Sequence, residues 1–276
     1  RITIMQRPEN FVLDYSHPLA RGLRLAGLGY NIDDSQTYYD SSPLKNHGQK
    51  VGPFNTGCHN GIPFIENQNA SAINFPSLFS NTDAKKFTFC CWVKYANNGG
   101  YPTLFYNSDY VLRDDICVFC SLGRDSLGRE LCANAIGDFV AAAYVIQSES
   151  AAIFDKWHHF AVVYNFEDSF CACYVNGELP LQTVIEDPPI SLNMSEYDFQ
   201  LMGELVEEDS LNLFSVKDFM VWENRALTQA EIRELANPSN AMLSGMIKPP
   251  KRKYYAIRST PMSKRYFRIG RVVTSW

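Results

Sequence analysis

The sequence has few of the features that assign a function directly. No stretch approaches the roughly 18 apolar residues that a membrane-spanning helix requires. No glycine-rich phosphate loop is present, and the five histidines suggest no nucleophile–histidine–acid set. The N-terminal residues lack the apolar core of a secretory signal, and the chain does not begin with Met. These absences argue against a membrane span, nucleotide chemistry and triad hydrolysis.

Helical periodicity is also scarce, and strand patterns dominate. Residues 87–95 alternate, with Phe, Phe, Cys, Val and Tyr at the odd positions, which we expect to face a core. Residues 159–164 and 170–175 are rich in aromatic and aliphatic residues, with a loop of hairpin length between them. Asn176-Gly177 follows at once and favours a type I′ turn.

One helix is predicted, close to residue 230. Thr228 and Glu231 have the spacing of a capping box, helically spaced apolar residues follow, and Pro238 prevents continuation. Further strands are expected near residues 101–106, 115–121, 138–146, 197–203 and 213–222. Many strands, one short helix and no βαβ repeat predict an all-β protein, a two-sheet antiparallel jelly-roll sandwich.

The eight cysteines invite a disulfide framework, but their positions favour another interpretation. Four of them lie inside apolar strand patterns: Cys90, Cys91, Cys171 and Cys173. Cysteine packs in such places as a small hydrophobic side chain. We therefore expect free thiols in the core rather than a disulfide framework.

Four parts of the chain, taken in order, resemble a known family. They contain the strings HPLARGL (17–23) with YDSSPLKNHG (39–48), FTFCCWV (87–93), KWHHFAVVY (156–164) with YVNG (174–177), and DFMVWENRALT (218–228). Together they resemble the laminin-G-like/concanavalin A-like lectin–glucanase jelly-roll domain, in the form found in tailed-phage structural proteins. The resemblance implies a lectin-like domain over residues 17–240, between an N-terminal arm (1–16) and a basic C-terminal tail (241–276).

Charge is distributed unevenly along the chain. Residues 1–234 hold 16 Lys/Arg and all 30 Asp/Glu, whereas residues 235–276 hold nine Lys/Arg and no acid. An acidic body with a basic tail suggests that the tail meets a separate partner. We expect a protein neighbour rather than nucleic acid, which the acidic body would repel. The candidate anchoring residues are Lys251, Arg252, Lys253, Arg265, Arg268 and Arg271.

Ligand residues can be suggested only from residue type. Aromatic side chains in loops are a common sugar-binding device, so Tyr38, Tyr101 and Tyr106 are candidates; the alternative is packing at the edge of the core. Lectins of this fold often bind Ca²⁺ through loop oxygens, and Asp40 is the first candidate. The alternative for Asp40 is a carboxylate that caps a turn. No other cofactor is expected.

Two chemical alternatives have weaker support. Glucanases of this fold need paired carboxylates, but residues 204–209, the densest acidic cluster, are typical of a solvated loop. Cys117 and Cys120, with Cys132 and Cys58-His59, have ligand types that suit zinc. However, residues three apart in a strand face opposite sides, which disfavours shared ligation.

These observations predict a non-enzymatic virion structural or decoration protein. Its tail would anchor it to capsid or tail neighbours in a homo-oligomeric assembly, and surface glycans are its candidate ligands. Two alternatives stay open: an extracellular Ca²⁺-dependent lectin, and a glycoside hydrolase of the concanavalin-like fold.

Overall fold

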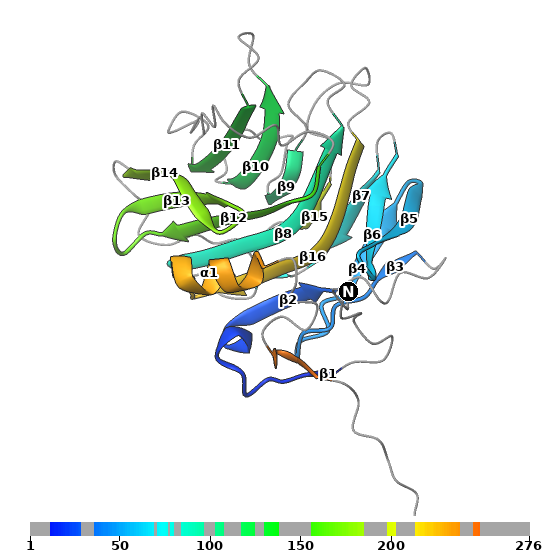
Figure 1. Ribbon diagram of the computed structural model, residues 1–276, viewed down its shortest axis with the longest axis horizontal. Helices are drawn as coiled ribbons and strands as arrows, with labels where there is room; N and C mark the ends of the chain where they lie inside the picture. The colour runs from blue at the N-terminus through cyan, green and yellow to red at the C-terminus, as the bar shows by residue number, and fades with distance from the viewer. Residues whose placement is uncertain are drawn as a thin grey trace, which may run out of the picture.

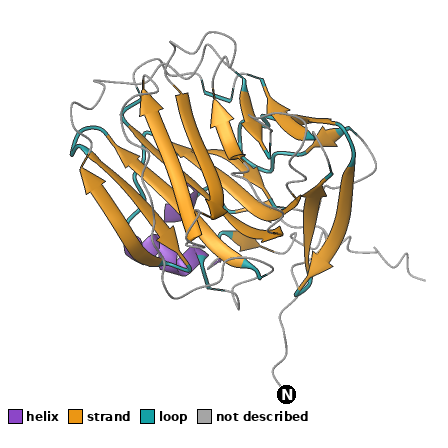
Figure 2. Ribbon diagram, turned by 90° about the horizontal axis from the view of Figure 1, so that it is seen from above, coloured by secondary structure: helices purple, strands orange, loops and turns teal. Residues whose placement is uncertain are grey.

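The chain folds as a sandwich of two antiparallel sheets (Figures 1 and 2). The computed structural model describes residues 12–28, 36–68, 71–76, 78–79, 84–96, 103–107, 117–124, 130–137, 156–184, 198–202, 213–237 and 245–248. Within these residues, every recorded pair of strands is antiparallel, and strands greatly outnumber helical segments. The predicted fold class is therefore confirmed.

One sheet has eight strands. In spatial order they are β14 (Glu178–Val184), β13 (Phe170–Val175), β12 (His158–Asn165), β8 (Lys86–Ala96), β16 (Leu213–Glu223), β6 (Ile62–Asn67) and β5 (Phe54–His59), with β2 (Leu23–Gly27) also paired to β16. The long strands β8 and β16 form its centre. The first part of β16 pairs with β6 and the last part with β2.

The other sheet has seven strands. In order they are β11 (Glu130–Gly137), β10 (Cys117–Arg124), β9 (Thr103–Asn107), β15 (Phe199–Leu201), β7 (Ala72–Phe75), β4 (Gly48–Val51) and β3 (Thr37–Tyr38). A separate two-stranded pair joins β1 (Val12–Leu13) to β17 (Ile247–Lys248). The helical segments are η1 (Pro18–Ala20) and α1 (Gln229–Leu235), and no described helix is long and apolar enough to cross a membrane.

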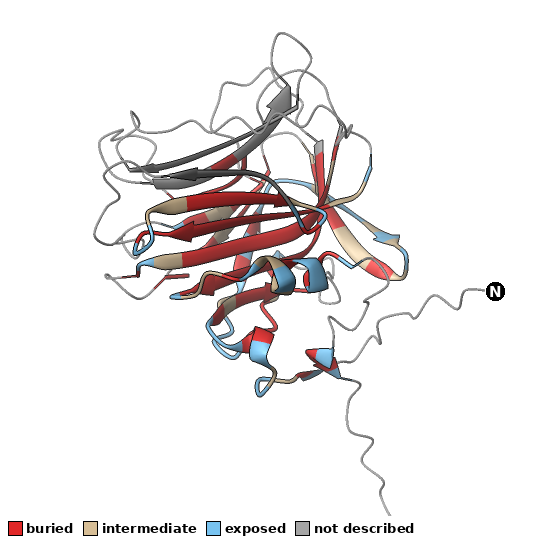
Figure 3. Cartoon of the chain, turned by 60° about the vertical axis from the view of Figure 1, so that its left-hand side comes forward, coloured by how far each residue is buried: buried red, intermediate tan, exposed pale blue. Residues whose placement is uncertain are grey.

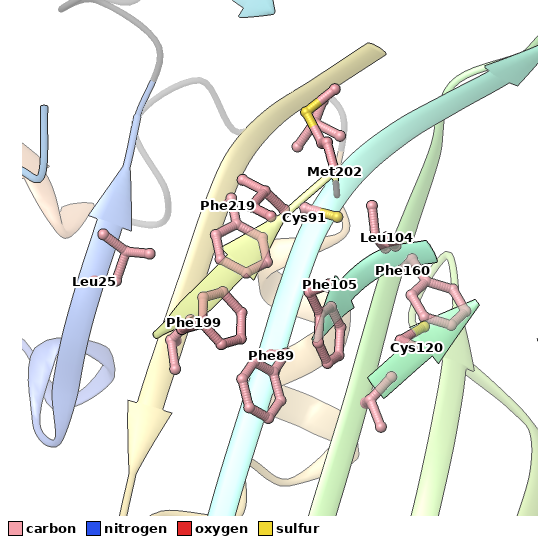
Figure 4. Packing of buried hydrophobic residues seen from close by; sticks show 14 of the residues in the cluster. Leu25, Phe89, Cys91, Leu104, Phe105, Cys120, Phe160, Phe199, Met202 and Phe219 are labelled. Carbon is pink, nitrogen blue, oxygen red and sulfur yellow. The ribbon is translucent and has the colours of Figure 1, made fainter. Parts of the chain in front are cut away.

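The main core lies between the two sheets, where aromatic rings interdigitate (Figure 4). Phe89 on β8 stacks against Phe105 at 4.5 Å between ring centroids and against Phe199 at 5.7 Å. The odd-numbered residues of β8, from Phe87 to Tyr95, all belong to this core. The predicted inward face of residues 87–95 is therefore confirmed.

A second core covers part of the outer face of the eight-stranded sheet. Helix α1 lies across this face beside β8 and β16 (Figure 1), and its residues Ile232 and Leu235 are buried. Cys90 and Trp222 pack in this cluster, and the Trp222 indole N–H donates to the Leu19 carbonyl at 2.7 Å. In Figure 3 the central strands are largely buried, whereas α1 exposes its outward side. Thus β8 is shared by two cores, one on each face.

Local signals fix the ends of these elements as predicted. Thr228 accepts a hydrogen bond from the Glu231 backbone N–H at 3.3 Å, and the Glu231 carboxylate accepts one from the Thr228 N–H at 2.9 Å. Asn176 and Gly177 have φ angles of 53° and 81°, as a type I′ turn requires. Cys90, Cys91, Cys171 and Cys173 are buried and form no disulfide, as expected. The strand predicted at 138–146 lies outside the described residues.

Candidate ligand-binding surface

The predicted stacking tyrosines do not lie on an accessible surface. Tyr38 is on β3, is only 3% exposed, and donates its hydroxyl to the Gly27 carbonyl at 3.2 Å. Tyr106 is on β9, is 7% exposed, and donates to the Gln200 side chain. Burial raises the pKa of Tyr106 to about 12. The prediction that these two rings stack on a sugar is therefore wrong, because both complete the sandwich; Tyr101 lies outside the described residues.

Asp40 organises a turn. Its Oδ1 accepts from the backbone N–H groups of Ala26 (2.8 Å) and Ser42 (2.7 Å), while Oδ2 accepts from the Asn46 N–H (2.8 Å) and the Ser42 hydroxyl. The residue is 1% exposed. This is the turn-capping alternative, and its donors occupy both carboxylate oxygens. Within the described part of the chain, no three His, Cys, Asp or Glu side chains form a group that could hold a metal.

Other sequence-based candidates are not brought together, or cannot be placed. Cys58 is exposed on β5 whereas Cys120 is buried between the sheets, so these two do not share a site. The acidic residues 204–209 and the six basic anchoring residues of the tail lie outside the described residues. Their roles stay predictions.

A cluster of aromatic side chains does reach the surface, on the outer face of the eight-stranded sheet. Trp157, just before β12, stacks on His59 of β5 with centroids 5.2 Å apart and an interplanar angle of 26°. Phe64 of β6 meets Trp157 edge-on at 5.3 Å. These three side chains are each partly exposed. We call Trp157, His59 and Phe64, with the Lys217 ammonium among them, the aromatic surface.

Strand register places these residues on the outer face. Trp92 alternates with the inward residues of β8 and pairs with Lys217 on β16, so both side chains point away from the main core. Ser215 of β16 pairs with Glu66 of β6, and Phe64 shares the face of Glu66 because it is two residues away. By the same rule, His59 shares the face of Gly57, which pairs with Phe64.

The Lys217 ammonium contacts the rings of the aromatic surface from the sheet on which they lie. Its side chain is buried, with the residue 4% exposed, and its Nζ lies 4.7 Å from the Trp157 ring centroid and 5.4 Å from that of Trp92. The same Nζ is 2.9 Å from His59 Nδ1. An ammonium over indole faces gains cation–π attraction that grows as water is excluded.

A row of polar side chains borders the aromatic surface. Lys94, Ser215, Glu66 and Asn55 follow one another across β8, β16, β6 and β5 in register. The Ser215 hydroxyl donates to Glu66 at 2.7 Å, and the Asn55 amide donates to Glu66 at 3.4 Å. Partly exposed rings beside hydrogen-bonding groups match the two faces of a sugar, one apolar and one hydroxylated.

Sequence reasoning did not identify this surface. The sequence offered Cys58-His59 only as a weak zinc candidate, and Trp157 only as part of a string that resembles the lectin family. The contributing residues lie on strands separated by as many as 158 positions, from His59 to Lys217. One local signal existed: Asn60-Gly61 has turn chemistry, with φ angles of 54° and 74°, and predicts the β5–β6 hairpin that carries His59 and Phe64.

A cleft of about 910 Å³ lies elsewhere, where the segment around η1 meets the turn after β16. The side chains of Arg24, Glu223 and Arg225 are already engaged. Arg24 pairs with Glu223 at 3.1 Å, and Arg225 donates to the Pro18 and Arg21 carbonyls at 2.6 and 2.7 Å. These bonds join the segments that resemble the lectin family, so we assign the cleft residues a structural role.

Comparison with known proteins places the chain in a family. A profile of the concanavalin A-like lectin/glucanases superfamily matches residues 67–233, more than half of the 276 residues. The chain belongs to this superfamily. The lectin-like resemblance is thus confirmed, whereas its tailed-phage form stays a prediction. No curated protein matches the chain.

Solved structures share the superfamily fold at low sequence identity. One is a structure of botulinum neurotoxin type C, a toxin whose cell entry depends on interaction with two ganglioside molecules. It has a TM-score of 0.54 and 14% identity over 80% of this chain. Domain 4 of AbnA, a GH43 extracellular arabinanase from Geobacillus stearothermophilus in complex with arabinotriose, has a TM-score of 0.57 and 17% identity over 78%. The chain spans 52% of the neurotoxin chain and 98% of the arabinanase domain. At such identities the likeness establishes the fold alone.

Proposed function

We propose that this chain is a non-catalytic carbohydrate-binding protein of a virion, which displays its jelly roll and uses its basic tail as an anchor. The observation that carries the binding role is the aromatic surface. It presents Trp157 and Phe64 beside a row of hydrogen-bonding groups on a rigid sheet. Rigid rings bind with little loss of conformational entropy.

Fold relatives support carbohydrate as the ligand class. The neurotoxin interacts with gangliosides, and the arabinanase domain was solved in complex with arabinotriose. Two proteins with this fold therefore bind molecules that contain sugars. Carbohydrate rings offer C–H groups to an aromatic face and hydroxyls to polar neighbours. The arrangement of Trp157 next to the Lys94–Asn55 row supplies both kinds of contact.

A glycan array tests the binding role. The full chain is applied at neutral pH, with arabinotriose included among the probes, and is compared with the variants Trp157→Ala and Phe64→Ala. Loss of a stacking contact should weaken binding about tenfold. Tyr15→Ala is the matched control, because Tyr15 is an aromatic residue with 49% exposure outside the aromatic surface. Equal binding by W157A and the native chain would contradict the assignment.

Two further measurements on the array distinguish this proposal from a Ca²⁺-dependent lectin and from a glycoside hydrolase. EDTA should leave glycan binding unchanged, since the aromatic surface binds through rings; loss with EDTA would favour the Ca²⁺-dependent lectin. The glycan probes should remain intact after long incubation, and the appearance of shorter products would favour the glycoside hydrolase.

The virion role rests on the charge division between body and tail. Residues 235–276 carry nine basic and no acidic residues, against a formal charge of −14 for residues 1–234. We propose capsid or tail proteins as the partners of Lys251, Arg252 and Arg265, with homo-oligomerisation in the assembly. Electron microscopy of the full chain and of a chain ending at Lys248 tests this: ordered assemblies should require residues 249–276. Assembly by the shortened chain would overturn the anchoring proposal.

A further inference from the structure

We infer that His59 makes the aromatic surface sensitive to acid: the surface is assembled while the His59 ring is neutral, and it opens and releases its ligand when that ring takes up a proton. The ligand part of this inference rests on the proposed function. The conformational part does not, and the two are tested separately.

The hydrogen bond between Lys217 and His59 defines the protonation state of the ring. Their nitrogens are 2.9 Å apart. An ammonium group can only donate, so His59 Nδ1 must accept and carries no proton. The remaining ring proton is then on Nε2. The observed geometry therefore requires a neutral imidazole in one tautomer.

The charges around His59 are predominantly positive. Lys217 faces it from β16 and Lys94 from β8; Lys156 and His158 flank Trp157 at the start of β12. Glu66 on β6 supplies a negative charge, but it is held by Ser215 and Asn55. Burial, with the charges of Lys217 and Lys94, lowers the pKa of His59 below its ordinary value of 6.5. The ring is thus neutral at neutral pH and is charged only in acid.

Protonation would place two positive charges 2.9 Å apart, and one of them must move. Lys217 is buried between two indoles on a central strand. His59 is the last residue of β5, which is paired only to β6 among the described strands, and the Asn60-Gly61 turn follows it. His59 is therefore the group that moves. Its stacking on Trp157 is lost, and with it one side of the ligand platform.

The other histidines near this surface are distinguishable from His59. His159 packs edge-on against Trp92 with ring centroids 5.6 Å apart, and burial lowers the pKa of His159 to about 3, so it stays neutral. His158 accepts a hydrogen bond at Nδ1 from the Asn176 amide at 2.9 Å, on the side of the hairpin turn. His158 is thus the one neighbour that needs its own control variant.

Nuclear magnetic resonance of ¹⁵N-histidine-labelled chain tests the conformational step. His59 should show the Nε2–H tautomer and titrate below the ordinary histidine value, and Lys217→Met should raise its pKa. The fluorescence of Trp157, identified by difference from Trp157→Phe, should change with the same midpoint. His59→Phe keeps a stacked ring that cannot be protonated, so its fluorescence should not respond to acid. His158→Gln should behave like the native chain.

Three results would overturn the conformational step. They are an Nδ1–H tautomer of His59, a Trp157 response that persists in H59F, and a response that disappears in H158Q. Each can be read without any ligand. The K217M variant adds a fourth check, because removing the ammonium removes the repulsion; an undiminished acid response in K217M would also contradict the inference.

Ligand release is then measured with the glycan that binds best on the array. Native chain should bind it about tenfold more weakly about one pH unit below the His59 midpoint measured by nuclear magnetic resonance than near pH 7.5, whereas H59F should bind equally at both. Binding that is independent of pH in the native chain would overturn the release step while leaving the proposed function intact. No glycan bound at any pH would instead contradict the proposed function, and the spectroscopic results would still decide the conformational step.

Discussion

At the scale of the residue, buried polar groups in this protein do structural work that their type alone does not reveal. Asp40 accepts four hydrogen bonds inside the turn that follows β3. His159, equally buried, is kept neutral by desolvation. From sequence, Asp40 was a weak candidate for a metal ligand with turn capping as the favoured alternative, because carboxylates in loops serve both purposes. Only the positions of the donors separate these roles.

Replacing Asp40 with Asn should destabilise the protein. The amide NH₂ would face the Asn46 N–H or the Ala26 N–H, so at least one buried donor would lose its acceptor. We expect a decrease of about 1.5–3 kcal/mol in the free energy of unfolding, measured by urea denaturation. Glu178→Gln is the control: Glu178 makes only an exposed ion pair with Arg233, and its loss should leave stability nearly unchanged. Equal stability of D40N and the native chain would contradict the capping role.

At the scale of the element, a strand, turn or helix cap could be predicted when the residues that specify it are close together in the sequence. The inward face of β8, the β12–β13 pair, the Asn176-Gly177 turn and the cap of α1 were all predictable, because each is encoded within a few consecutive residues. The strands before residue 86 were not predicted. They are mostly short, such as β4 with four residues, and several also pair with strands that are distant in sequence, as β6 does with β16. The aromatic surface was missed for the same reason, since pairing with β16 brings β5 and β6 to it.

The contact between the β13–β14 turn and α1 gives the prediction at this scale. A Cβ on Gly177 would lie 2.8 Å from Arg233 Cα on the helix, and Gly177 has a φ of +81°. Gly245 has a similar φ of +92°, but a Cβ there would meet nothing within 4 Å. Both substitutions to Ala incur backbone strain, and only G177A also pushes α1 away. We expect G177A to lower the free energy of unfolding by about 1–3 kcal/mol more than G245A does. Equal effects would show that the helix tolerates displacement from the turn.

At the scale of the whole molecule, the two cores lie on opposite faces of shared strands, and β8, β12, β13 and β16 each contribute residues to both. Cys91 points into the core between the sheets, and the adjacent Cys90 points into the cluster under α1. Cys120, from the opposite sheet, lies in the first of these cores with Cys171. Burial raises the pKa of Cys90 and Cys91 well above the ordinary thiol value, so neither reacts while folded.

Thiol labelling therefore reports whether the two cores, on either face of the eight-stranded sheet, unfold together. Iodoacetamide, followed by peptide mass spectrometry, should modify exposed Cys58 rapidly in native protein, and the five thiols that the structure describes as buried only on unfolding. In rising urea, Cys90 and Cys91 should become reactive at the same concentration, because one strand cannot leave one core and keep its place in the other. Reaction of Cys90 before Cys91 would mean that α1 and the segment around η1 detach first. In that case the outer layer is a separate unit of stability, and the sheet beneath it is the domain that folds alone.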